Sequence, residues 1–456
     1  MSSTLSISDQ INNKYKEYAL YVLQSRGIPN FYDSLTPVQR IILENSPSHF
    51  NKTIGLVGEV IRTGLYHHGD SSLSGAISKL ARPFGCSYQV LEGDGFFGSP
   101  VNPSPSAARY TSVRINPEIK NIVNRHSDLN EKNEEGGHGW LHVEVPVGLL
   151  THIIGIAVGY RSNILPRKME DIIEYLEGKN KILKPYFRDF TGKIYKFENE
   201  ENVWLLESGF ESNASKRTIR IFDLPPVMRY DSFMEKLINK LSSYGHEFKL
   251  NNNSQSKCDV TVWFSKIQPK EFQSVVDLVK KLTQIIVKED VVLIKDGGVA
   301  QFNSVKEYLD AFKIHLETVK LRRLAKDFEN LKFDLEFLEA KLKFLIFMSQ
   351  KKRTNEEITT FLSQFVSWIS TKLSNIQIVK LSSDHIAETE ATIKKIKQLI
   401  KETQTLIKKQ ESVVKILGPI KLKGKSTSLI PLGSEPLRIN TDIEIFTPEE
   451  VNEDSE

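Results

Sequence analysis

The chain has 456 residues and a net charge of +4, with 39% hydrophobic and 26% charged residues. This composition is typical of a soluble globular protein, and the length allows two or three domains. Two distant cysteines, Cys86 and Cys258, exclude a disulfide framework and a zinc site, and no apolar run reaches transmembrane length. The polar N-terminus lacks a signal-peptide core, so we expect a cytoplasmic protein.

The first predicted elements are two helices. Residues 10–26 carry an apolar stripe at helical spacing, and Arg26-Gly27-Ile28-Pro29 ends it. A second helix is expected from Thr36-Pro37 through Leu43, because proline suits the first helical turn.

Residues 54–84 predict two further helices, joined at His67 and His68. This is the pattern of a helix-turn-helix or winged-helix core, with Lys79 and Arg82 on the outer side of the second helix. A solvated helix face explains those two cations equally well. A metal site is not favoured, because adjacent histidine side chains diverge and no other ligand cluster is near.

A glycine-punctuated loop, Gly93-Asp94-Gly95-Phe96-Phe97-Gly98-Ser99, leads to the pair Arg109-Tyr110. Glycines allow tight turns and close backbone approach. A tyrosine can act as a nucleophile, and an adjacent guanidinium can hold phosphate oxygens. Most Arg-Tyr pairs are surface or packing residues, so this pair alone does not indicate catalysis.

Beyond Tyr110 the sequence predicts a strand at residues 112–115 and a buried strand pair within the apolar residues 141–159. Residues 167–300 alternate helix and strand signals, with helices near 169–176 and 233–241 and strands near 193–196, 218–222 and 260–264.

Heptad patterns begin after Ser304. One segment carries Leu309, Phe312, Leu316 and Val319 and then a shifted set from Phe328 to Leu345, and a second carries Ile386, Ile393, Ile400, Ile407 and Val414. Two such segments about forty residues apart predict an antiparallel coiled coil with a small helical cap between them. The final twenty or so residues are strongly acidic, which is typical of disorder.

The motifs together resemble one family. They are Arg26-Gly27-Ile28-Pro29, residues 33–40, Tyr66-His67-His68-Gly69-Asp70, Arg109-Tyr110, Gly155-Ile156-Ala157-Val158-Gly159 and Asn163-Ile164-Leu165-Pro166. In this order they are similar to the DNA breakage-reunion subunit of type IIA topoisomerases, a family that includes the T4-like phage medium subunit, gyrase A and the centre of eukaryotic topoisomerase II. The resemblance implies an intracellular, bacteriophage-type isomerase.

The resemblance also implies a fold and a domain order. It implies an α+β, mostly helical chain with a winged-helix DNA-gate domain at 1–138 and a tower domain at 139–302. A coiled coil follows at 303–417, with a C-gate cap at about 348–384, and then a basic and acidic tail at 418–456.

Specific roles follow from the resemblance. Tyr110 would form a transient 5′-phosphotyrosyl bond, with Arg109 and with His68 beside it, and Ile156 would wedge between base steps and bend DNA. The DNA contacts implied are Arg26, Arg40, Lys52, His67, Lys79, Arg82 and Arg114. Thr36, Gln39 and Ile41 stand where relatives have basic residues or histidine, and Thr151-His152 stands where relatives often have Asn-Gly.

The sequence shows no glycine-rich ATP-binding pattern and no Glu…Asp-x-Asp metal cluster. The resemblance therefore places Mg²⁺ and ATP on a separate ATPase/TOPRIM large subunit, in a heterotetramer around a homodimer of this chain. It implies relaxation and decatenation of DNA. The alternatives are a non-catalytic architectural DNA-binding protein with the same helices and coil and, more weakly, a tyrosine recombinase.

Overall fold

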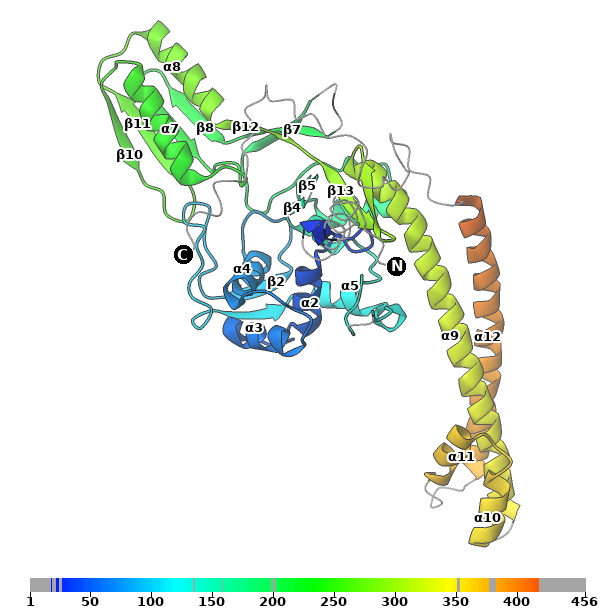
Figure 1. Ribbon diagram of the computed structural model, residues 1–456. Helices are drawn as coiled ribbons and strands as arrows, with labels where there is room; N and C mark the ends of the chain where they lie inside the picture. Colours follow the sequence, from blue (N-terminus) through cyan, green and yellow to red (C-terminus); the bar gives the residue numbers. More distant parts are fainter. Residues whose placement is uncertain are drawn as a thin grey trace, which may run out of the picture.

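The computed structural model describes residues 18, 22–23, 27–133, 136–157, 159–197, 200, 202–350, 353–376 and 383–417. Most of the helix predicted over 10–26, the DNA contact predicted at Arg26, and the tail at 418–456 lie outside these residues. Figure 1 shows three parts: a main block around α2 to α5, an α/β lobe around α7 and α8, and a long two-helix arm formed by α9 and α12. The mixed α+β class is confirmed.

The main block begins with helices around a small antiparallel sheet. Its elements are α2 (Pro37–Asn45), β1 (Asn51–Lys52), α3 (Thr53–Arg62), α4 (Asp70–Ala81), β2 (Leu91–Asp94), β3 (Ser112–Ile115) and α5 (Pro117–Asn124), with strand order β1-β3-β2. The predicted helices near 36–43 and 54–84 are confirmed. Pro37 opens α2 behind a capping box of Thr36 and Gln39, which satisfies backbone groups at the helix start.

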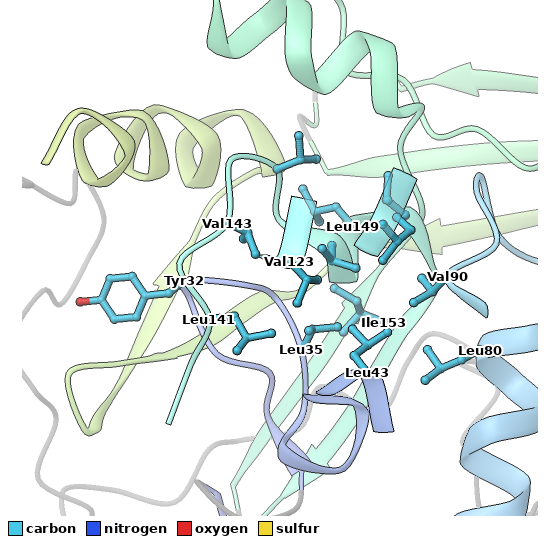
Figure 2. Packing of buried hydrophobic residues seen from close by; sticks show 14 of the residues in the cluster. Tyr32, Leu35, Leu43, Leu80, Val90, Val123, Leu141, Val143, Leu149 and Ile153 are labelled. Carbon is cyan, nitrogen blue, oxygen red and sulfur yellow. The ribbon is translucent and has the colours of Figure 1, made fainter. Parts of the chain in front are cut away.

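A single hydrophobic core joins the start of the chain to much later segments. It takes in residues from Phe31 to Leu183 and again from Val291 to Leu316, and Figure 2 shows Leu35, Leu43, Val123 and Leu149 within it. This core includes residues on both sides of the domain boundary expected between residues 138 and 139, which stays a prediction.

The later elements of the main block share this core or pack beside it. They are η2 (Ser127–Leu129), η3 (Val147–Leu150), β4 (Ile153–Ala157), β5 (Tyr160–Ile164), α6 (Met169–Leu176), β13 (Val291–Lys295) and β14 (Gly298–Phe302). The strand pair predicted within 141–159 is only partly confirmed: β4 lies in this range but pairs with β5 beyond it, and Val147–Leu150 forms a 3₁₀ turn. The Gly148 amide donates to the Asp33 carbonyl at 3.1 Å, which folds this segment against the chain start.

The α/β lobe contains two antiparallel sheets. Its elements are β6 (Lys193–Lys196), β7 (Val203–Glu207), β8 (Gly209–Asn213), β9 (Thr218–Phe222), α7 (Tyr230–Ser243), β10 (Phe248–Asn252), β11 (Asp259–Phe264), α8 (Pro269–Leu282) and β12 (Gln284–Lys288). The strand orders are β10-β11-β9-β8, which packs with α7 and α8 around one core, and β12-β7-β6. The strands predicted near 193–196, 218–222 and 260–264 are confirmed.

The arm is a pair of long antiparallel helices, α9 (Val305–Gln350) and α12 (Ser383–Leu417). Glu339 pairs with Lys397 at 2.8 Å, whereas Glu317, earlier in α9, accepts from Gln410, later in α12, so the directions oppose. The predicted antiparallel pairing is confirmed. Between them, α10 (Asn355–Leu362) and α11 (Ser367–Ser374) form the end of the arm, where Ile369 and Leu373 pack on α9. No helix in the described ranges has the length and apolar character to cross a bilayer.

Candidate active site

Tyr110 lies on an exposed turn just before β3. Its side chain is 66% exposed, and its amide donates to the Ala107 carbonyl at 2.8 Å, which closes the turn. The guanidinium carbon of Arg109 lies 4.8 Å from the centre of the Tyr110 ring. A phenol and a guanidinium therefore lie together at the surface, as expected from the Arg109-Tyr110 pair in the sequence.

The start of α3 holds this turn in place. The first amides of a helix lack partners within the helix, and here Thr53 donates to the Thr111 carbonyl at 3.0 Å and Ile54 to the Ala108 carbonyl at 3.2 Å. The buried hydroxyls of Thr53 and Thr111 also share a 2.8 Å hydrogen bond. Tyr110 thus lies at the N-terminal, electropositive end of α3, where negative charge is favoured.

The glycine loop packs directly beneath the tyrosine turn. Gly95 has φ +105°, and a Cβ there would lie 3.2 Å from Thr111 Cγ2 and 3.5 Å from the Tyr110 carbonyl. Gly98 has φ +89°, and its Cβ would lie 2.6 Å from the Pro103 carbonyl. Both positions need a left-handed backbone and allow little side-chain volume, so the glycines are required for the shape of this loop.

The two histidines follow the other end of α3. His67 is exposed, whereas His68 is half-buried with its ring 5.5 Å from that of Tyr66. Tyr110 is held at the N-terminus of α3, and a ten-residue helix is about 15 Å long. Residues 63–68 lead from the end of α3 to His68, so the length of α3 does not fix the distance between His68 and Tyr110, and the expected place of His68 beside Tyr110 stays a prediction.

Most of the basic residues predicted to contact DNA fall into two groups, those with exposed and those with half-buried side chains. Lys52 is exposed and pairs with Ser112 on the strand that follows Tyr110, so it lies at the same end of the sheet as the tyrosine. Arg114 is half-buried, is bonded to Glu92 at 2.6 Å, and lies over the Phe50 ring. On α4, Lys79 is exposed, while Arg82 at its end is half-buried against Phe84.

Arg40 has a structural environment and does not fit the DNA-contact prediction. It is only 3% exposed, its Nε donates to Asp33 at 2.7 Å, and its Nη2 donates to the Leu35 carbonyl at 3.1 Å. Asp33 is fully buried and also accepts from the Leu141 amide. This guanidinium is used inside the fold and has no exposed face to offer a phosphate.

Ile156 lies on the β4–β5 hairpin with 56% of its side chain exposed. Ile154, two residues earlier, is 58% exposed. The sequence predicts an apolar DNA contact only at Ile156, although strand alternation in the Ile153–Ala157 segment also indicates Ile154 on the same face.

Among the described residues, no group of three or more His, Cys, Asp or Glu side chains could hold a metal ion. The residues around Tyr110 therefore do not form a metal site by themselves.

Comparisons with known proteins agree on one family. The family model for the A subunit of DNA gyrase/topoisomerase IV matches residues 26–419. The chain is 24% identical over 440 residues to the DNA gyrase A subunit of Buchnera aphidicola, covering 86% of this chain and 51% of the relative. It is 26% identical over 250 residues to the DNA topoisomerase medium subunit of Enterobacteria phage T4, covering 52% of this chain and 55% of that one.

Further matches cover more of the chain. The DNA topoisomerase 4 A subunit of Staphylococcus aureus is 24% identical, covering 98% of this chain and 62% of the relative. In fold, the chain resembles the DNA-binding, cleavage and re-ligation domain of Plasmodium falciparum topoisomerase II, with a TM-score of 0.72 and 20% identity over 91% of this chain and 64% of that one. The chain thus spans between half and two thirds of these relatives. Because the family model matches most of its length, the chain belongs to the family of DNA gyrase and topoisomerase IV A subunits.

Proposed function

We propose that this chain is the DNA cleavage and religation subunit of an ATP-dependent type II topoisomerase. The observation that carries the proposal is the exposed Tyr110 beside Arg109, on a turn fixed by α3 and the glycine loop. Family membership supports the same reading. The enzyme would break both strands of one duplex, let a second duplex pass, and reseal the break, which relaxes or decatenates DNA.

In the proposed reaction the phenolic oxygen of Tyr110 attacks a backbone phosphorus. A new O–P bond forms to the 5′ side of the break, the bond to the 3′ oxygen breaks, and the phenolic proton leaves as the 3′ oxygen gains one. The bond energy stays in the phosphotyrosyl ester, so the 3′ hydroxyl can reverse the step. Arg109 stabilises negative charge on the phosphate oxygens, aided by the electropositive end of α3.

We propose that the site is shared by two copies of the chain, because the Tyr110 turn is held at the N-terminus of α3 and His68 follows its C-terminus. In this proposal the His68 that acts on the phosphate attacked by Tyr110 comes from the second protomer. The outer face of α3 fits such a contact: Ile54 and Ile61 are exposed, and Gly58 between them has open space beyond its Cα. We therefore place a homodimer contact at this helix, within a winged-helix DNA gate.

The tip of the arm offers a second surface for the homodimer. Exposed apolar side chains occur along this part of α9 and at the start of α11, among them Phe333 at 56%, Ile346 at 39% and Val366 at 53%. Apolar groups exposed on this scale are typical of interaction sites. In the proposal this surface is the exit gate, and the α/β lobe is the tower that flanks bent DNA.

The family implies Mg²⁺ and ATP, and we place both on a partner ATPase/TOPRIM subunit. Mg²⁺ there would stabilise charge on the scissile phosphate and the leaving oxygen. The described residues of this chain contain no cluster fitted to hold the ion. The chain's own contribution is therefore the nucleophile, the cations around it and the shape of the DNA-binding surface.

Covalent trapping tests the nucleophile. The chain is mixed with its ATPase/TOPRIM partner, Mg²⁺ or Ca²⁺ and 3′-end-labelled duplex, and the reaction is stopped with detergent. We expect label on the wild-type protein, none on Tyr110→Phe, and normal labelling of Tyr195→Phe, which removes the hydroxyl of another exposed tyrosine. Binding without label in the wild type would instead favour the architectural protein.

Mixed dimers test the shared site. His68→Ala and Tyr110→Phe homodimers should each fail to cleave. A heterodimer of the two variants should regain one working site, and hence single-strand nicks, because one protomer supplies the tyrosine and the other the histidine. A heterodimer as inactive as the parents would place both groups in one chain.

A further inference from the structure

The outer face of the β4–β5 hairpin presents two isoleucines, and only one of them has an expected role. Ile154 and Ile156 are 58% and 56% exposed, whereas the alternating residues Ile153 and Gly155 are buried. Residues two apart in a strand point to the same side. The pair therefore forms one projecting apolar edge on this hairpin.

The hairpin that carries the pair is firmly held from behind. A Cβ at Gly155 would lie 2.1 Å from the Gly27 carbonyl, and one at Gly27 would lie 2.4 Å from the Ile156 carbonyl, so the two backbones touch. The adjoining residues Ile28 and Ile294 are buried in one small core with Ala157 packed against it. Because the strand is packed against this backbone, an apolar side chain on its outer face can contact a ligand without displacement of the strand.

The polar residues opposite the pair are already engaged. Ile154 stands across from Asn163, and Ile156 from Arg161. Arg161 Nε donates to Asp290 at 2.8 Å, and the Asn163 side chain is bonded to His152 at 2.9 Å and to the Lys288 carbonyl at 3.1 Å. These bonds fix the polar neighbours to the main block and leave the isoleucines as the groups that project.

We propose that Ile154 is a second apolar contact to the DNA duplex, acting together with Ile156. This inference rests on the proposed function. Side chains two apart in a strand are separated by about 6.8 Å, and two base steps also span about 6.8 Å along a duplex. Apolar side chains inserted at base steps unstack them and kink DNA. With two such side chains in register, the hairpin contacts two steps and bends the duplex more than one wedge would.

Binding and bending are measured in a Tyr110→Phe background, so that no cleavage intervenes. The full chain is titrated into a short duplex with a fluorophore at each end, at one fixed salt concentration because affinity depends on salt. We expect Ile154→Ser to weaken binding about fivefold and to lower end-to-end energy transfer, and the double variant with Ile156→Ser to lose most of the bend. Ile182→Ser, at a 79% exposed isoleucine elsewhere, is the matched control.

A base analogue locates the contact. 2-Aminopurine is placed at successive steps, where unstacking raises its fluorescence. Two bright steps, one lost in Ile154→Ser and the other in Ile156→Ser, would support the proposal. The proposal would be overturned if DNA bending and affinity were unchanged in Ile154→Ser but lost in Ile156→Ser. It would also be overturned if Ile154→Ser altered only self-association in sedimentation, because Ile154 would then be a protein contact.

The two proposals fail separately. If the chain with Tyr110 intact is trapped on DNA but Ile154→Ser bends the duplex normally, only the role of Ile154 is refuted. Absence of trapping in every condition would refute the cleavage function, whatever the bend. Because both isoleucines are largely exposed, serine at either position should leave thermal unfolding unchanged, which checks that the variants fold.

Discussion

The main block and the arm are built in contrasting ways. The main block has one core that joins segments some 270 residues apart, and it encloses the Arg40–Asp33 ion pair. The arm is held together by the contact between two helices, α9 and α12. Thr389 and Ile393 are the only buried side chains among those described in α12. Packing is therefore dense and long-range in one part, and thin and local in the other.

The difference suits what each part is proposed to do. A nucleophile has to be held within a fraction of an ångström, and the tyrosine turn is fixed by backbone hydrogen bonds, a buried threonine pair and glycines that exclude side chains. An arm that closes a cavity and opens for a duplex needs length and the freedom to bend. Few buried contacts per residue are typical of regions that open easily.

The largest expected effect is at the buried ion pair of the main block. Asp33→Asn should leave the Arg40 guanidinium buried without a counter-charge and lower the free energy of unfolding by about 3–5 kcal/mol. This loss of stability is measured by urea unfolding, with hydrogen exchange of residues 31–43 as the readout.

Two companion variants interpret that result. Glu59→Gln breaks the exposed pair with Arg62 and should change nothing measurable. The double variant Asp33→Leu with Arg40→Met should recover much of the lost stability, because apolar groups can replace a buried pair. If Arg40→Met instead left stability intact and reduced the salt dependence of DNA binding, Arg40 would be a phosphate contact after all.

The second effect concerns the shape of the glycine loop. Gly98→Ala combines a left-handed backbone with a Cβ 2.6 Å from a carbonyl, so the loop beneath Tyr110 has to shift. We expect covalent trapping to fall about a hundredfold, as a misplacement of about 1 Å can cause. Gly85→Ala is the control, since Gly85 has φ +71° with nothing within 4 Å of its Cβ. Equal losses in both variants would mean that backbone strain alone matters.

The sequence predicted more of the arm and of the strand elements than of the site's packing. Heptads in 386–414 and alternation in 218–222 depend on neighbours along the chain, which a sequence displays directly. The environment of Arg40 depends on Asp33 and on Leu141, a hundred residues away, and no local pattern separates a buried arginine from an exposed one.

The third effect tests whether the arm is energetically separate. Ile393→Ala removes the most buried apolar side chain of α12 and should destabilise the local helix pairing by about 2 kcal/mol. Hydrogen exchange should quicken along α12 and leave β1 to β3 unchanged. Leu406→Ala, at a half-exposed position of the same helix, should have little effect. Faster exchange around Tyr110 in Ile393→Ala would show that the two parts are coupled.

The smallest effect lies at the junction of the two parts, where α9 leaves the main block. His315 of α9 packs 4.5 Å from the Tyr32 ring and 5.7 Å from the His142 ring, and its Nε2 has no hydrogen-bond partner. Burial, followed by repulsion from His142, Arg322 and Lys295, lowers the pKa of His315 to about 3, with Asp296 opposing. Burial and the same arginine also lower the pKa of His142.

A lowered histidine pKa means that protons bind the opened junction more readily than the closed one. The free energy that favours the closed junction is therefore at its full value above about pH 6.5, where the histidines are neutral in both forms. It declines as the pH falls from about 6.5 toward 3, because protons then bind the opened form. Between pH 7.5 and 5.5 we expect the junction to lose about 1 kcal/mol, seen as faster hydrogen exchange in residues 305–319 after correction for pH. His315→Phe should remove much of this dependence, because phenylalanine fits among Phe31, Tyr32 and Phe312 without titrating. His49→Gln, at an exposed histidine of the main block, should keep it. A junction whose exchange is the same at both pH values in the wild type would mean that the histidines stay neutral in the opened form too, and that the main block and the arm are joined by packing alone.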